Sequence, residues 1–124
     1  MGRRLSLLRY SGAVLLHLPT VGEIIELSDK QTKFRGNRPN RPCLCYSRRE
    51  ASINVVPLSS KGELEGSGYE LPSSAAYGLD GPSFIVDHIA TIDYLTAISA
   101  KSLGHLTPDL LPEALEHIWM VIDP

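Results

Sequence analysis

The alternation of apolar and polar positions predicts a small β-sheet. Residues 21–27 (VGEIIEL) are short, β-branched and partly alternating, which is typical of a strand. Residues 41–47 (RPCLCYS) and 52–58 (SINVVPL) predict two further strands, joined as a hairpin by the polar turn between them. Residues 83–95 (SFIVDHIATIDYL) predict another strand segment, interrupted by an aspartate and a histidine. The sheet is therefore expected to be mostly antiparallel.

The C-terminal residues have the clearest helical pattern. Thr107 is suited to cap a helix, and Pro108 is suited to its first turn. Pro112 follows one turn later, so that either the helix proper begins there or one hydrogen bond is lost. Apolar residues then recur with the helical period and form one stripe: Leu111, Leu115, Ile118 and Ile122. The predicted fold class is mainly β (α+β), with a small twisted sheet and a C-terminal α-helix packed on it.

Two segments predict loops. Residues 28–40 (SDKQTKFRGNRPN) are polar, basic and rich in turn formers, and we expect an exposed, mobile loop there. Residues 61–83 contain five glycines and two prolines, which predicts turns around at most one short strand near residues 69–71.

The composition is that of a soluble globular protein whose charge is unevenly distributed. The 124 residues suit one domain with one core, with 43% apolar and 21% charged residues. The net charge of −2 combines +7 over residues 1–61 with −9 over residues 62–124. A basic half can attract phosphates or an acidic partner segment. Alternatively, the two halves simply neutralise each other in the fold.

The cysteines and the N-terminus indicate a cytoplasmic protein. Cys43 and Cys45 would share one face of a strand, too close for an unstrained disulfide and too few for a metal site. We expect two reduced thiols in the core. Residues 1–20 contain no cleavage site and no apolar run that could span a membrane. They are interpreted as an N-terminal extension, followed by one domain over residues 21–124.

Asp87 is the most informative single residue. It follows the apolar residues of the 83–95 segment, and burying a carboxylate costs several kcal/mol unless it is paired or hydrogen-bonded. The residue is therefore either a strand-end aspartate bonded to backbone N–H groups or a functional carboxylate.

The order of the segments resembles that of a known family. GEIIEL, RPCLCYS, INVVPLSS, SFIVDHIATID and LGHLTPDLLPEALEHI together resemble the MazF/PemK toxins of bacterial toxin–antitoxin pairs, over roughly residues 21–122. The resemblance implies an SH3-like barrel with helices, assembled as a homodimer. It also implies metal-independent, sequence-specific cleavage of single-stranded RNA, commonly messenger RNA, without a cofactor. An acidic cognate antitoxin would block the activity.

The resemblance assigns roles to particular residues. Cleavage without a metal requires a base for the ribose 2′-OH, a cation for the developing charge and an acid for the leaving oxygen. Asp87 matches the family's carboxylate and is the predicted base. Arg41 matches the arginine that contacts phosphate, a role that suits the planar guanidinium, although Arg38 offers a second register for the same motif. Ser59 and Ser60 match the hydroxyl residues after the third strand.

One position departs from the family pattern. Ile85 stands where the PemK branch has an arginine assigned as general acid, and isoleucine cannot donate a proton. His88 replaces the usual glutamine, and an imidazole is able to protonate a leaving oxygen. On a regular strand, however, His88 and Asp87 point to opposite faces. We therefore expect Arg41 to supply the cationic group.

The basic loop is the predicted substrate-binding surface. Lys33, Arg35 and Arg38 can follow a phosphate backbone, and Phe34 among them can stack on a base. A merely solvated run of charge is the alternative.

Two other functions share this fold. Gyrase-poisoning toxins of the CcdB type bind a protein partner through C-terminal residues, and Trp119 invites that comparison. A catalytically inactive relative is the other alternative, favoured by Ile85. His105 and His117 are interpreted as structural.

Overall fold

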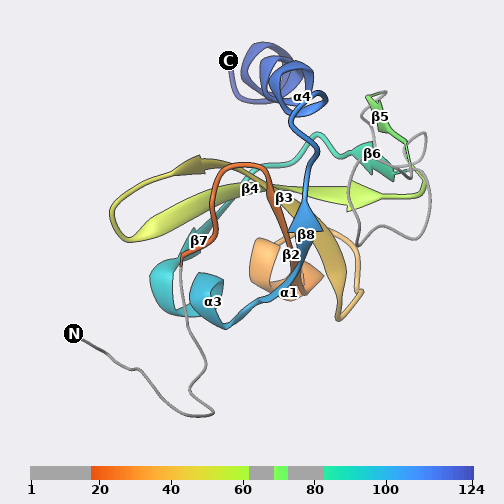
Figure 1. Cartoon of the computed structure of the whole chain (residues 1–124). Coiled ribbons are helices and arrows are strands. Elements are labelled where there is room, and N and C mark those ends of the chain that lie inside the picture. Colours follow the sequence, from red (N-terminus) through yellow and green to blue (C-terminus); the bar gives the residue numbers. More distant parts are fainter. Residues whose placement is uncertain (1–17, 62–68, 73–82) are drawn as a thin grey trace.

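The protein is a curled, antiparallel sheet with helices on both faces (Figure 1). The computed structural model describes residues 18–61, 69–72 and 83–124. Neighbouring strands follow the order β5-β6-β4-β3-β2-β8, and β7 also pairs with β4. The strands are β2 (Glu23–Leu27), β3 (Arg41–Arg48), β4 (Ser52–Ser59), β5 (Glu70–Leu71), β6 (Ser83–Ile85), β7 (Ala90–Asp93) and β8 (Lys101–His105). This arrangement confirms the predicted mainly antiparallel sheet.

The strands predicted from alternation lie close to their expected positions. β2, β3 and β4 match the three predicted segments, and β3 pairs with β4 as the expected hairpin. β5 is the short strand anticipated in the glycine-rich region. β8 was not predicted, because its exposed edge position leaves it without a buried face to impose alternation.

The predicted strand over residues 83–95 is instead two strands separated by a bend. β6 pairs with the end of β4, and β7 pairs with its beginning. The N–H of Val86 donates to the carbonyl oxygen of Pro57 (2.9 Å), but Pro57 has no N–H to return. The ladder is therefore interrupted opposite Pro57, and this interruption places Asp87 and His88 on the bend.

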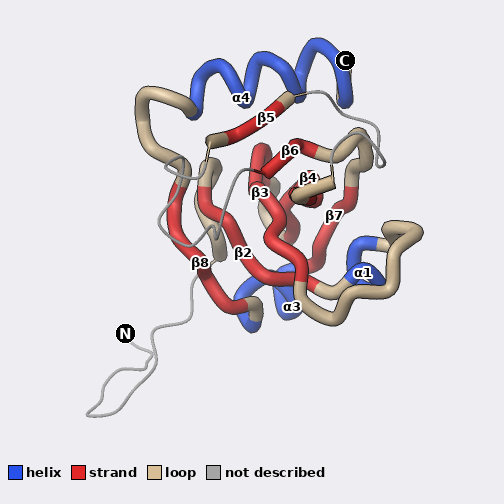
Figure 2. The backbone as a smooth tube through the Cα atoms, turned by 90° about the vertical axis from the view of Figure 1, so that its right-hand side faces the viewer, coloured by secondary structure: helices blue, strands red, loops and turns tan. Residues whose placement is uncertain are grey.

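The helices form two groups on opposite sides of the sheet. Figure 2 shows α4 (Leu111–His117) across one side and the short helices α1 (Asp29–Thr32) and α3 (Tyr94–Ser99) on the other. A π-helical turn, η2 (Ile118–Ile122), extends α4.

The C-terminal helix begins at Leu111, in agreement with the alternative that a separate first turn precedes a helix proper near Pro112. Leu110, and not Thr107, is the cap residue of α4, and Pro112 lies in the first turn, where a missing N–H costs no helical hydrogen bond. The carbonyl oxygen of Thr107 accepts from Leu110 and Leu111 in the preceding turn.

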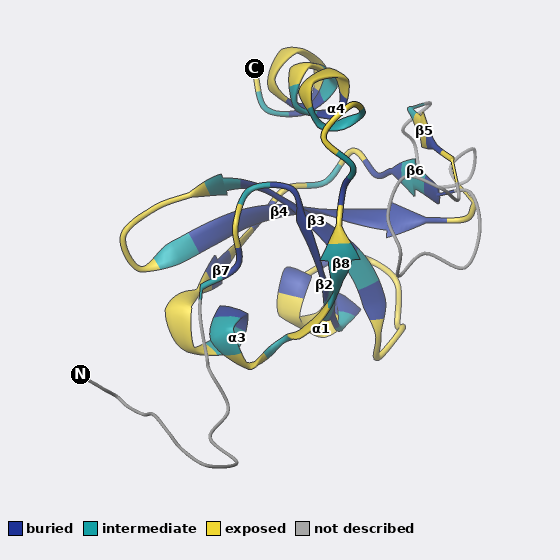
Figure 3. Cartoon of the chain, viewed as in Figure 1, coloured by how far each residue is buried: buried dark blue, intermediate teal, exposed yellow. Residues whose placement is uncertain are grey.

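Alternate residues of the strands supply two cores, and Figure 3 shows β3 and β4 buried along most of their length. Leu44 and Tyr46 of β3 pack with Ile118 on the α4 side. Cys43 and Cys45 pack with Val55 and its neighbours on the α1 and α3 side. Both cysteines are free thiols on one face, as predicted, and burial raises their pKa, to about 12 for Cys45.

The segment over residues 28–40 is more ordered than the expected mobile loop. Ser28 and Gln31 form a capping box that starts α1, in which each side chain bonds the other residue's N–H. Thr32 and Phe34 are buried beneath the segment. Residues 35–40 are exposed.

Candidate functional site

A pocket of about 240 Å³ lies between the end of β4 and the loop that precedes β3. Its walls carry positive charge, hydroxyl groups and backbone of the loop. The lining residues are Gly36, Asn37, Arg38, Arg41, Ser59, Ser60 and Lys61. Cations and hydroxyls around a small cavity are suited to an anion, and phosphate oxygens are the natural acceptors for such donors.

Strand pairing brings the β3 and β4 parts of the pocket together. Because Cys43 lies opposite Pro57, the antiparallel register places Arg41 beside Ser59. Nη1 of Arg41 donates to the carbonyl oxygen of Leu58 (3.3 Å). The hydroxyl of Ser59, which is buried, accepts from the N–H of Lys61 (3.0 Å). Four residues predicted from the sequence are therefore neighbours at this pocket: Arg38, Arg41, Ser59 and Ser60.

Arg41 is held in a buried ion pair with Asp29. Its Nε donates to Oδ1 of Asp29 (2.6 Å) and its Nη2 to Oδ2 (3.1 Å), with both side chains almost fully buried. Burial favours a raised pKa for Asp29, but the hydrogen bonds from Arg41 and from the N–H of Arg38 outweigh it, so the pKa lies below its ordinary value. The guanidinium predicted to contact phosphate is thus engaged with a carboxylate.

Asp29 is the residue that sequence reasoning missed. An aspartate directly after Ser28 in the first turn of a helix is an ordinary partner for the helix dipole. Its pairing with an arginine twelve residues later depends on the loop closing back on itself, which local pattern does not reveal.

Phe34 lies beneath the cationic groups and is only 5% exposed. The guanidinium carbons of Arg41 and Arg35 lie 4.9 Å and 5.0 Å from its ring centroid, and the ring of His88 meets its edge at 5.3 Å. The predicted stacking of Phe34 on a base is therefore wrong, because protein groups already cover the ring.

Asp87 and His88 lie on the bend and turn to different sides. Nε2 of His88 donates to the carbonyl oxygen of Thr32 (2.9 Å) at the end of α1. Asp87 is exposed, and its charge acts on His117 of α4: burial lowers the pKa of His117, and Asp87 partly opposes that shift. Asp87 is not among the residues that line this pocket.

The remaining predicted positions have clear locations. Ile85 is fully buried in the α4-side core, which explains an apolar residue there. Lys33 and Arg35 are exposed outside the pocket lining, and Lys33 ends α1 in the left-handed conformation (φ 60°). His117 packs against Tyr69 (4.6 Å between ring centroids).

The search of the described ranges for a metal site found no group of three or more His, Cys, Asp or Glu side chains able to hold an ion. Among the helices described, none is long and apolar enough to span a membrane.

Comparison with known proteins supports the fold. No protein-family model matches the sequence, and no curated protein matches it. Among solved structures, a chain of "Crystal structure of MazE-MazF (Form-II) from Deinococcus radiodurans" is similar, with a TM-score of 0.58 and 20% sequence identity. The similarity covers 85% of this chain and 98% of that chain. The fold is thus a MazF-like α+β fold, a curled half-barrel with a C-terminal helix, as the sequence resemblance implied.

Proposed function

We propose that this protein is the toxin of a toxin–antitoxin pair and cleaves single-stranded RNA without a metal. The pocket carries the proposal, because it collects cationic and hydroxyl side chains at one small cavity. The similarity to a chain of a MazE–MazF complex supports it at the level of fold.

The exposed side chains of Arg38, Ser60 and Lys61 would hold the RNA phosphates, with Lys33 and Arg35 extending this basic surface. The hydroxyl of Ser59 would orient the scissile group. Asp87 remains the proposed base, from its match to the family's carboxylate. His88 is the second candidate for the base. Its Nε2 donates a hydrogen bond, which leaves Nδ1 as the basic nitrogen of the neutral ring.

Cleavage is tested with a labelled single-stranded RNA in excess EDTA. We expect cut products ending in a 2′,3′-cyclic phosphate, since the ribose hydroxyl is the nucleophile. Asp87→Asn should reduce the rate by about a hundredfold or more, the usual contribution of a general base. If His88→Gln has that effect and Asp87→Asn does not, the base is His88. Arg48→Gln, an exposed change at the far end of β3, is the control and should cleave like the parent.

A catalytically inactive relative that only binds RNA is the second candidate. It is favoured by the position of Ile85 in the core and by a pocket lining that does not include Asp87. Binding without cleavage in the same assay would support it, whereas absence of both binding and cleavage would contradict RNA as the target.

Salt dependence identifies the phosphate contacts. Each lost contact should lower the slope of log Kd against log salt by about 0.7 for a single strand. We expect Arg38→Gln and Lys61→Gln each to do so, while Arg48→Gln leaves the slope unchanged. If both pocket variants have the same slope as the parent, RNA does not bind at this pocket.

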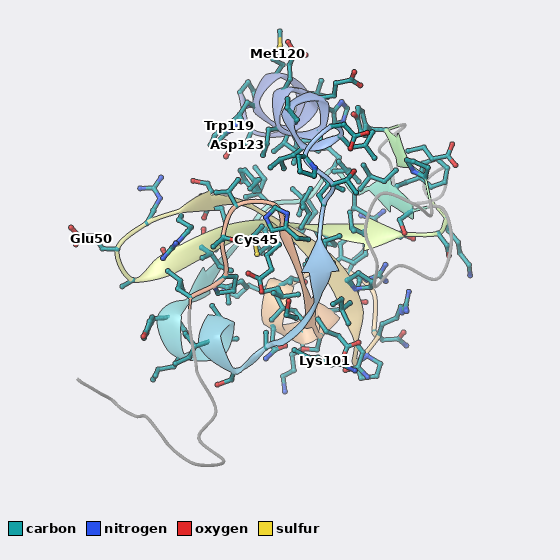
Figure 4. All side chains as sticks on the ribbon, in the orientation of Figure 1. Cys45, Glu50, Lys101, Trp119, Met120 and Asp123 are labelled. Atoms are coloured by element: carbon teal, nitrogen blue, oxygen red, sulfur yellow. The ribbon has the colours of Figure 1, made fainter. Side chains whose placement is uncertain are left out.

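We propose two protein partners in addition. An acidic antitoxin segment would compete with RNA for the basic surface, and a second copy would complete a homodimer. Exposed apolar side chains on α3 and the C-terminal helix are available for such contacts: Tyr94, Leu95, Trp119, Met120 and Val121. Figure 4 shows Met120 projecting away from the sheet. Light scattering after size-exclusion chromatography measures the dimer directly.

A further inference from the structure

We propose that Asp29 is the residue that positions the loop at the pocket. Its ion pair with Arg41 has almost no net charge, so that Arg38 and Lys61 bind the phosphate. The choice of RNA as the ligand rests on the proposed function. The role of Asp29 in positioning the loop does not depend on it.

Asp29 closes the loop that forms the pocket wall. Its N–H donates to the carbonyl oxygen of Arg38 (2.9 Å), and its Oδ2 accepts the N–H of Arg38 (2.9 Å). The same carboxylate binds Nε and Nη2 of Arg41 at the start of β3. One buried side chain in the first turn of α1 therefore holds both Arg38 in the loop and Arg41 at the start of β3, and we infer that it preforms the pocket wall.

Gly36 gives an independent indication of this arrangement. A Cβ atom at this position would overlap Oδ2 of Asp29 and lie 3.2 Å from Nη2 of Arg41. The loop backbone therefore passes directly over the ion pair, and the pocket wall at this point accommodates glycine without displacing the carboxylate.

The charges of Asp29 and Arg41 largely cancel at the pocket. The two groups are 2.6 Å apart at their closest atoms, so an anion in the cavity experiences a dipole and not a full cation. Arg38 and Lys61 also line the cavity, and their side chains are exposed. They supply the net positive charge.

A double-mutant cycle separates support from direct contact. Arg41→Gln leaves a buried carboxylate without its cation beside the pocket, and we expect Kd for a short fluorescein-labelled single-stranded RNA to rise by about tenfold or more. Asp29→Asn combined with Arg41→Gln removes both charges and should restore Kd to within about threefold of the parent. If Arg41 contacts phosphate itself, the double variant will bind as weakly as Arg41→Gln, and the proposal is overturned. Arg48→Gln and Asp93→Asn, both exposed, are the matched controls.

A second measurement needs no RNA. Gly36→Ala should lower the urea midpoint of the parent, and should lower it much less in an Asp29→Ala background, where the obstructing carboxylate is gone. Equal losses in both backgrounds would contradict the packing of the loop on Asp29. We also expect faster hydrogen exchange at the Arg38 amide in Asp29→Ala than in Asp93→Ala. A parent that fails to bind RNA but meets both expectations would refute the proposed function and retain Asp29 as the residue that positions the loop.

Discussion

The bend between β6 and β7 turns Asp87 and His88, adjacent in sequence, to different surroundings. His88 bonds to the end of α1 and touches Phe34, whereas Asp87 is exposed and acts on His117 of α4. The guanidinium of Arg41 lies over the same Phe34 ring. The role open to each side chain depends on the side of the bend to which it points. The match of Asp87 to the family's catalytic carboxylate does not by itself determine that side.

Asp87→Asn is expected to lower the pKa of His117 further. Burial already holds that pKa below its usual value, and Asp87 opposes the shift. A histidine with a depressed pKa contributes stability above its unfolded pKa of about 6.5, which is lost as the pH falls through the folded value. Because replacing Asp87 lowers the folded pKa further, the pH range over which this stability is lost becomes wider. NMR titration of the His117 ring protons measures the shift, with Asp93→Asn as control. An unchanged pKa would show that Asp87 does not lie near His117.

At the scale of elements, most strands and one helix could be predicted, but their breaks could not. Short, β-branched or apolar runs marked β2, β3 and β4, and most residues on both faces of these strands are buried. Pro57 lies within β4 and interrupts the ladder on the side of β6 and β7, which divides the predicted 83–95 strand. The sequence showed both the proline and the 83–95 segment, but it did not show that the two would lie opposite each other.

Beyond its apolar packing on the sheet, the C-terminal helix is held by Tyr46 of β3. The hydroxyl of Tyr46 on β3 donates to Oδ2 of Asp123 (2.9 Å), and the Trp119 ring packs edge-on against the Tyr46 ring at 5.3 Å. Burial raises the pKa of Tyr46, and the bond to Asp123 raises it further, so the hydroxyl remains a donor throughout the physiological range.

Tyr46→Phe should lower the free energy of unfolding by about 1 kcal/mol, the usual net value of one hydrogen bond. The ring contact with Trp119 is retained in this variant, so tryptophan fluorescence of the folded state should change little. Urea denaturation followed by fluorescence measures both quantities. Tyr94→Phe removes the hydroxyl of an exposed tyrosine and should leave stability unchanged. Equal stability of both variants would mean that the bond to Asp123 contributes nothing.

At the scale of the whole molecule, the sheet separates two cores. The α4 side includes Ile24 and Ile118, and the α1 and α3 side includes both cysteines. Strand pairing holds the two layers together, since β2, β3 and β4 contribute to both. Their unfolding is therefore expected to be cooperative.

Thiol labelling tests that cooperativity. Both cysteines are fully buried, and their raised pKa values suppress the reactive thiolate. We expect no reaction with Ellman's reagent in native buffer and rapid reaction of two thiols in guanidinium chloride. At intermediate denaturant, the reactive fraction should follow the unfolded fraction measured by fluorescence. Rapid labelling of the native protein would show that the layer around β3 opens locally.

The sequence by itself determined the strand core, the C-terminal helix and the residue types that make a phosphate site, because these depend on local periodicity and side-chain chemistry. The family resemblance named Arg38, Arg41, Ser59 and Ser60 as candidate site residues, and the register of β3 against β4 brought Arg41 beside Ser59 at one pocket. Only the tertiary structure decided that Arg41 pairs with Asp29 and that the bend leaves Asp87 exposed. Those outcomes depend on loop closure and on a break in a strand ladder, which are set by contacts between residues far apart in the chain.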